Sequence, residues 1–277
     1  MFELSMTRLH EVMLILYAVS VLLYFMDYLQ KDQKANRLAF WLLTIVWVLQ
    51  TIFLFLYMMR TGRFPVLTLF EGIYFYAWVL VTLSLAINRV MRVDFTVFFV
   101  NVIGFTFMAI HTFAPVQAST NAAAERLMSE LLLIHITIAI VSYAAFSVSV
   151  VFSILYLLQY RLLKKKKWGQ KLQRITDLSK LEKGSVILNI IGFPLLLLSL
   201  ILGVQWAVIS LPYMIWYDVK IIGSFLLLGI YGVFLYRRFG RGESGRTLAI
   251  FNTMAFLCLI INFLLGSRLS SFHFWYS

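Results

Sequence analysis

Histidine is the residue type of this sequence best suited to metal chemistry, and it occurs only at His10, His111, His135 and His273. A neutral imidazole binds a metal ion through one ring nitrogen while a hydrogen-bond acceptor holds the other nitrogen. The sequence has a single cysteine, Cys258, and no cluster of carboxylates beside the histidines, so a closed zinc site is poorly supported. Iron in a porphyrin asks less of the protein, because the macrocycle supplies four nitrogens and only one or two axial histidines are needed.

A heme also needs apolar and aromatic walls, and residues 203–220, GVQWAVISLPYMIWYDVK, could supply them. The aromatic side chains of this stretch are Trp206, Tyr213, Trp216 and Tyr217. Its only charges are Asp218 and Lys220, and an acid and a base two residues apart suit hydrogen bonds to a polar ligand edge. Trp and Tyr are also common where a membrane meets water, so a simple interfacial belt is the alternative.

The elements that carry these residues are membrane spans. The chain has 277 residues, of which 62% are hydrophobic and 13% charged, against about 25% charged residues in a typical soluble domain. A helix needs about 20 apolar residues to cross a bilayer. Segments of this kind cover residues 9–29, 37–59, 69–88, 93–114, 131–160, 184–208, 218–236 and 247–266. We therefore predict an all-α polytopic membrane protein with eight transmembrane helices, forming a single transmembrane domain over residues 1–277.

The distribution of basic residues predicts the orientation of these spans. Of the 24 Lys and Arg residues, 18 lie in or directly beside the connections after the first, third, fifth and seventh segments. Cytoplasmic connections collect Lys and Arg, so we expect the N-terminus and the C-terminus to lie outside. All four histidines and the aromatic stretch then lie on the outer side, where hydrogen bonding to lipid headgroups is the alternative to metal binding. The net charge of +12 follows from the same bias and needs no nucleic-acid partner.

The connection at residues 161–183, RLLKKKKWGQKLQRITDLSKLEK, is basic and carries an apolar residue at every third or fourth position. This pattern predicts an amphipathic helix on the inner leaflet, bound to anionic membrane lipid. Docking of a cytoplasmic protein is the alternative.

Two features of the spans restrict the fold and the function. The segment 131–160 carries small residues at helical spacing, which predicts a close contact with a neighbouring helix. They are Ala139, Ser142, Ala145, Ser149 and Ser153. No Asp, Glu, Lys or Arg falls near the centre of any segment, which argues against an ion-coupled transporter.

Several blocks of the sequence resemble the cytochrome c assembly family, the group of CcsA and CcmC. GFPLLLLSLILGVQWA followed by WYDVK resembles the tryptophan-rich heme-handling segment of that family. GRFPVLTLFEGIYFYAW (62–78) resembles its outer loop P-x-x-N-L-x-E-S, with Pro65, Leu69 and Glu71 retained. IHITIAIVSYAAFSVSVVFSILYLLQ (134–159) resembles the span that opens with the first external heme histidine, and FLLGSRLSSFHFWYS resembles the end that carries the second. The order of the blocks, over nearly the full chain, is similar to the HemX subgroup.

The resemblance implies one external heme, heme b, with His135 and His273 as its axial ligands. The platform around the heme would consist of Trp206, Tyr213, Trp216, Tyr217, Asp218 and Lys220. Candidate auxiliary residues are His10, His111, Glu71 and Arg268.

The resemblance also implies a function in heme supply or in the regulation of heme biosynthesis, through the level of glutamyl-tRNA reductase, at the bacterial cytoplasmic membrane. Tyr236 stands where the heme-attaching synthases of the family carry a further histidine. We therefore expect a protein that binds heme and is not an enzyme. A cytochrome c assembly factor that presents heme to an apocytochrome, beside other assembly proteins, is one alternative, and a tetrapyrrole exporter is another.

Overall fold

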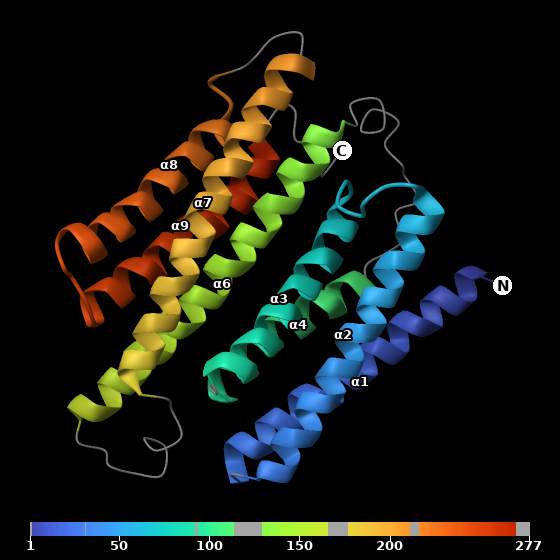
Figure 1. Ribbon diagram of the computed structural model, residues 1–277, viewed down its shortest axis with the longest axis horizontal. Helices are drawn as coiled ribbons and strands as arrows, with labels where there is room; N and C mark the ends of the chain where they lie inside the picture. Colours follow the sequence, from blue (N-terminus) through green and yellow to red (C-terminus); the bar gives the residue numbers. More distant parts are fainter. Residues whose placement is uncertain are drawn as a thin grey trace. The chain divides into compact units, whose positions relative to one another are not determined.

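The computed structural model describes residues 2–30, 32–91, 94–113, 129–165, 177–210 and 216–269. These residues are helical apart from short connections, and eight helices are long and apolar enough to cross a membrane, which confirms the predicted fold class. The helices form two compact units, Met1–Gln117 and Ala118–Ser277 (Figure 1). The single transmembrane domain and the orientation of the termini stay predictions.

The first unit is a four-helix bundle. Its helices are α1 (Phe2–Gln30), α2 (Gln33–Thr61), α3 (Leu69–Met91) and α4 (Asp94–Phe113). α1 packs against α2 and α4, and α3 packs against the same two helices, so the four close into a ring. Asp32 caps the start of α2 by accepting a hydrogen bond from the Lys34 N–H at 2.8 Å. Gly62 ends α2 with a φ of 66°, a conformation that favours glycine.

Buried polar side chains join the helices of the first unit. The Tyr17 hydroxyl of α1 donates to Asn101 Oδ1 of α4 at 3.1 Å. Asn101 Nδ2 donates in turn to Ser84 Oγ of α3 at 2.7 Å. Because hydrocarbon offers no water to unpaired polar groups, such contacts fix which helix faces meet.

The second unit is also a ring of four helices. They are α6 (Glu130–Lys164), α7 (Leu178–Ser210), α8 (Val219–Leu235) and α9 (Arg246–Leu269), with one π-helical turn, η2 (Tyr236–Gly240), after α8. α6 and α8 each pack against both α7 and α9. In the core, the Phe146 ring of α6 stacks on the Tyr231 ring of α8 with centroids 3.6 Å apart.

The serines among the small residues of α6 form hydrogen bonds to α7, which confirms the close helix contact predicted for this face. The two helices run antiparallel and side by side (Figure 1). Ser142 Oγ donates to the Gly192 carbonyl at 2.8 Å, and Ser149 Oγ donates to the Ser185 carbonyl at 2.9 Å. These contacts span several turns, so the two helices share a continuous seam.

Glycines of α7 receive aromatic rings of α6 along the same seam. A Cβ atom at Gly184 would lie 2.7 Å from the Phe152 ring, and one at Gly192 would lie 2.7 Å from the Phe146 ring. Real Cβ atoms do not approach other atoms this closely, so the ring positions depend on the absence of a side chain at these glycines.

Asn252 of α9 completes a buried polar cluster on the seam. Its Nδ2 lies 2.9 Å from Ser149 Oγ, 2.8 Å from Ser153 Oγ and 3.1 Å from Ser185 Oγ. Its Oδ1 accepts a hydrogen bond from Asn189 Nδ2 at 3.0 Å. One amide therefore ties α9 to both α6 and α7.

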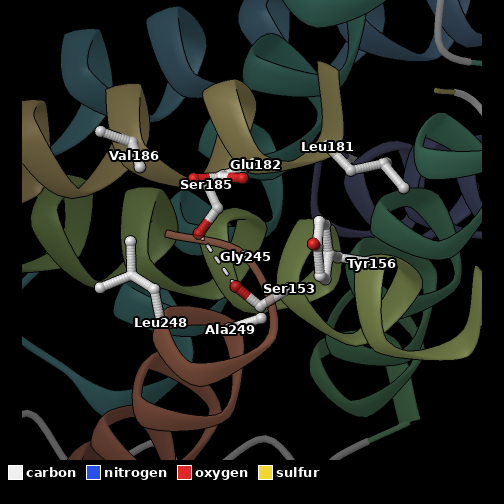
Figure 2. Close-up of a pocket in the computed structure, with 9 residues that line it drawn as sticks. All are labelled: Ser153, Tyr156, Leu181, Glu182, Ser185, Val186, Gly245, Leu248 and Ala249. Atoms are coloured by element: carbon white, nitrogen blue, oxygen red, sulfur yellow. Dashed lines mark hydrogen bonds between the residues drawn. The ribbon is translucent and has the colours of Figure 1, made fainter. Parts of the chain in front are cut away.

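A shallow hollow opens beside this cluster (Figure 2). Ser153 and Ser185 line it and are hydrogen-bonded to each other at 2.9 Å. Glu182, also in its wall, accepts a hydrogen bond from Arg238 at 2.9 Å.

In the connection before α9, a hydrogen bond from Arg237 holds the pKa of Glu243 below its ordinary value.

We predict that Asn252→Ala lowers the free energy of unfolding of the second unit by about 1–2 kcal/mol, because it removes the donor shared by three serines and the acceptor of Asn189. Thermal or SDS unfolding of the purified protein measures this loss. The control is Thr253→Ala on the same helix, whose hydroxyl bonds only the Ala249 carbonyl of its own helix at 2.9 Å. Equal losses in the two variants would contradict an interhelical role for Asn252.

Candidate heme site

His135 lies in the second turn of α6 and is held by α7. Ser129 caps the start of α6, accepting a hydrogen bond from the Leu132 N–H at 3.3 Å, so the histidine stands on an ordered helix. Its Nδ1 lies 2.6 Å from the Ser199 carbonyl oxygen and 3.1 Å from Ser199 Oγ. Ser199 Oγ also donates to the His135 carbonyl at 3.0 Å. One serine of α7 thus contacts both the ring and the backbone of His135.

The bond to the Ser199 carbonyl determines the tautomer of His135. A carbonyl oxygen only accepts hydrogen bonds, so Nδ1 carries the hydrogen and Nε2 carries the lone pair. Within the described part of the chain, Nε2 makes no hydrogen bond. A neutral imidazole held through Nδ1–H by a backbone carbonyl is the usual arrangement of a metal-ligating histidine. The ring therefore fits an axial ligand of a heme iron.

Gly203 lets the His135 ring lie against α7. A Cβ atom at Gly203 would come within 2.6 Å of His135 Cε1. Ser199 and Gly203 are four residues apart and so share one face of the helix. Neither residue is among the predicted site residues, although their Ser-x-x-x-Gly spacing within GFPLLLLSLILGVQWA could have identified this helix face.

The predicted aromatic platform has a buried part and an exposed part. Trp206 follows Gly203 by one turn on α7 and is 7% exposed. Trp216 and Tyr217 precede α8 and are 56% and 88% exposed. Their uncovered rings offer flat apolar surface that suits a porphyrin face and equally suits the membrane boundary.

Asp218 and Lys220 have different roles. Asp218 is buried, and its carboxylate caps α8 by accepting from the Lys220 N–H at 2.8 Å. The Lys220 side chain reaches α9, where Nζ donates to the Asn262 carbonyl at 3.3 Å and lies 5.4 Å from the centroid of Phe263. A cation at this end of α8 suits a heme propionate.

Three of the predicted site residues fall outside what the structure describes. His273 and Tyr213 lie outside the described residues, and Arg268 belongs to α9 without a described side chain.

Glu71 of the first unit forms a capping box at the start of α3. Its Oε2 accepts from the Thr68 N–H at 3.2 Å, while Thr68 Oγ1 accepts from the Glu71 N–H at 3.2 Å. The carboxylate also pairs with the Arg63 guanidinium through contacts of 2.9 and 2.8 Å and accepts from the Tyr57 hydroxyl. The segment that resembles the family's outer loop thus contains the capping box of α3. Thr68 is its capping residue, at the position where the family pattern has Asn.

His10 and His111 meet inside the first unit. Their ring centroids are 5.1 Å apart, and both contact the Tyr74 ring. His135, Trp206 and Lys220 belong to the second unit.

Tyr236 opens the π-helical turn after α8. Its side chain is 60% exposed, and the Arg241 guanidinium lies 5.7 Å from its ring centroid. The residue that stands at the position of the synthases' further histidine therefore projects out of the helix ring.

Comparison with known proteins identifies the family of the chain. The sequence profile of the family described as cytochrome C assembly protein matches residues 66–273. The chain is 56% identical to protein HemX of Bacillus subtilis (strain 168), over 100% of both chains. It is 44% identical to protein HemX of Brevibacillus brevis over 97% of this chain and 98% of the relative. It is 27% identical to the cytochrome c biogenesis protein CcsA of Chlamydomonas reinhardtii over 78% of this chain and 62% of the relative.

The matched region contains α6, α7 and α8 entirely, and with them His135 and the described residues of the proposed platform. The eight spans and the profile match together make the chain a multi-pass, heme-related membrane protein. The chain belongs to the cytochrome c assembly protein family, in which it is similar over its full length to the HemX proteins.

Proposed function

We propose that the chain binds one heme, heme b, at the outer end of its second unit, with His135 and His273 as axial ligands. The observation that carries this proposal is the bond from His135 Nδ1–H to the Ser199 carbonyl, which leaves Nε2 with its lone pair. When bound, the heme would supply an iron with four nitrogen ligands already in place, so two histidines complete its coordination.

Residues 206–220 and Arg268 would supply the rest of the proposed heme site. Trp206 would provide a buried apolar wall, and Trp216 and Tyr217 an exposed one. Lys220 would pair with a propionate, as would Arg268, and Asp218 would act indirectly by fixing the start of α8. Tyr213 belongs to the same stretch of the sequence and completes the proposed platform.

We further propose that the protein acts in heme supply or in the regulation of heme biosynthesis, through the level of glutamyl-tRNA reductase, at the bacterial cytoplasmic membrane. The full-length similarity to two HemX proteins supports this role. The similarity to CcsA supports a second candidate, an assembly factor that presents heme to an apocytochrome. The exposed Tyr236 at the position of the synthases' further histidine favours the first candidate.

The ligand assignment predicts a spectroscopic result. Replacing either His135 or His273 by Ala should remove the bis-histidine signature from the absorption spectrum of the purified protein, and replacing both should abolish heme retention. Gly203→Ala should lower heme affinity by about 10- to 100-fold, the range typical of a disturbed ligand orientation, because the new methyl group displaces the ring.

Matched controls separate these effects from general damage. Gly229→Ala adds the same methyl group to α8 where nothing lies within 4 Å, so heme affinity should stay at the wild-type value. His10→Ala and His111→Ala should keep the bis-histidine spectrum. If those two variants lose the heme while His135→Ala and His273→Ala keep it, the assignment is wrong.

The proposed outer position of the site rests on the basic residues, and a fusion experiment tests it. A reporter that is active only outside the membrane should be active when fused after Ser277 and inactive when fused after Lys165, because the connection at 161–183 holds nine of the basic residues. The reverse pattern would move His135 and the aromatic stretch to the inner side.

We propose that the basic connection at 161–183 binds anionic lipid at the inner leaflet. Most of it lies outside the described residues, but its first residues line an open hollow with the start of α9. The lining residues are Tyr160, Arg161, Lys164, Lys165 and Arg246. None of these four cations forms an ion pair within the described part of the chain, so an anionic headgroup would satisfy them.

We expect the triple substitution of Lys164, Lys165 and Arg246 by Gln to reduce co-purifying phosphatidylglycerol, measured by native mass spectrometry, because each cation contributes about 1 kcal/mol of attraction to an anionic surface. Heme content should not change. Lys180→Gln, an exposed lysine of α7 outside the hollow, is the control. Unchanged lipid with an altered level of glutamyl-tRNA reductase would instead favour docking of a cytoplasmic protein.

A further inference from the structure

The histidine pair of the first unit is not among the proposed axial ligands of the heme. His10 of α1 and His111 of α4 meet with ring centroids 5.1 Å apart and ring planes inclined by 74°. Phe53 lies 4.3 Å from the ring of His10, and Tyr74 lies 5.0 Å from that of His111. Both nitrogens of His111 are buried, and neither makes a hydrogen bond within the described residues. Burying two unused polar atoms among aromatic rings is costly, which points to a ligand between the imidazoles.

The spacing of the two rings fits a bare metal ion. Two imidazoles that share a tetrahedral ion, with nitrogen–metal bonds of about 2.0 Å, have ring centroids about 5 Å apart. Axial ligands of a heme iron stand on opposite sides of the porphyrin, which places their centroids about 6 Å apart with the macrocycle between them. The pair at 5.1 Å therefore suits an ion better than a heme.

Two buried methionines lie one turn from these histidines. Met13 follows the histidine of α1 by three residues, and Met108 precedes the histidine of α4 by three, so each thioether shares the helix face of its imidazole. Both side chains are fully buried. Met13 Sδ lies 3.9 Å from the Tyr74 hydroxyl, and Met108 Sδ lies 3.7 Å from Gln50 Nε2.

The same aromatic residue brings imidazoles and thioethers into one region. The Tyr74 ring contacts both imidazoles, and its hydroxyl reaches Met13 Sδ and donates to the Gln50 carbonyl at 3.2 Å. The contacts of the two sulfur atoms are weak hydrogen bonds, which a metal ion would replace. Methionine has three rotatable side-chain bonds and adjusts easily to such a change.

We propose that His10, His111, Met13 and Met108 bind a soft monovalent metal ion of the Cu(I) class. Imidazole and thioether together favour Cu(I), whereas Zn²⁺ prefers imidazole, thiolate and carboxylate. No group of three His, Cys, Asp or Glu side chains gathers in the described ranges, so a third ligand to this pair has to be of another type, and the thioethers supply it. The four ligands are neutral, so the bound ion adds a single positive charge to the bundle interior, which is less costly to bury than two.

An anaerobic titration of the purified full-length protein with Cu(I), in competition with a chromogenic Cu(I) chelator, tests the site. The wild type should bind one Cu(I) ion per chain. His111→Ala should lower the affinity at least about tenfold, and the volume-conserving Met13→Leu and Met108→Leu should lower it less. X-ray absorption at the copper edge should show nitrogen and sulfur neighbours, with the sulfur contribution reduced in each leucine variant.

Controls come from the second unit. Met254→Leu, at an exposed position of α9, should bind Cu(I) as the wild type does. His135→Ala should also retain Cu(I) even where it loses heme, so failure of the heme assignment and failure of this one are read separately. The inference is overturned if the wild type retains no Cu(I), or if His111→Ala and both leucine variants bind it unchanged. Equal binding of Zn²⁺, unaffected by the two leucine variants, would also overturn it, because the thioethers would then not be ligands.

Discussion

The close approach of α6 and α7 is the contact on which the second unit depends. Lipid tails are as apolar as the side chains of membrane helices, so moving these side chains from lipid into a helix contact gains little free energy. Helix association therefore depends on close packing and on hydrogen bonds. The contact between α6 and α7 provides both. Ser142 and Ser149 reach carbonyl oxygens of α7, which is possible only where the backbones lie close together. Glycines of α7 make that distance attainable, since any side chain at Gly184 or Gly192 would meet an aromatic ring.

His135 is a further member of this series of rings on glycines. Phe152 lies on Gly184, Phe146 lies on Gly192, and His135 lies on Gly203, in order along the two antiparallel helices. The geometry that orients the candidate ligand is therefore the geometry that packs the bundle. The difference is chemical. A phenyl ring contributes packing alone. The imidazole of His135 packs against the same helix, donates through Nδ1–H to the Ser199 carbonyl, and leaves Nε2 available to another partner.

The helices and the face that α6 presents to α7 could be predicted from the length of the apolar segments and from the spacing of small residues. The eight spans follow from segment length alone, and the stripe at Ser142 and Ser149 follows from helical spacing. Asp218 and Glu71, two of the predicted site residues, also have structural roles: Asp218 caps α8, and Glu71 belongs to the capping box of α3, which the Thr-x-x-Glu spacing at Thr68 could have indicated. The contact of His10 with His111 could not be predicted, because it depends on which helices of the ring are neighbours.

The histidines of the two units differ in what their surroundings already satisfy. His135 has one nitrogen bonded to a carbonyl, so its tautomer and its direction are determined before any ligand arrives. The ring position of His111 depends on packing against Tyr74, and neither of its nitrogens is hydrogen-bonded within the described residues. The first situation suits a ligand of a large, preformed iron complex, which demands one directed lone pair. The second suits a small ion that enters between side chains and itself supplies the missing polar partner.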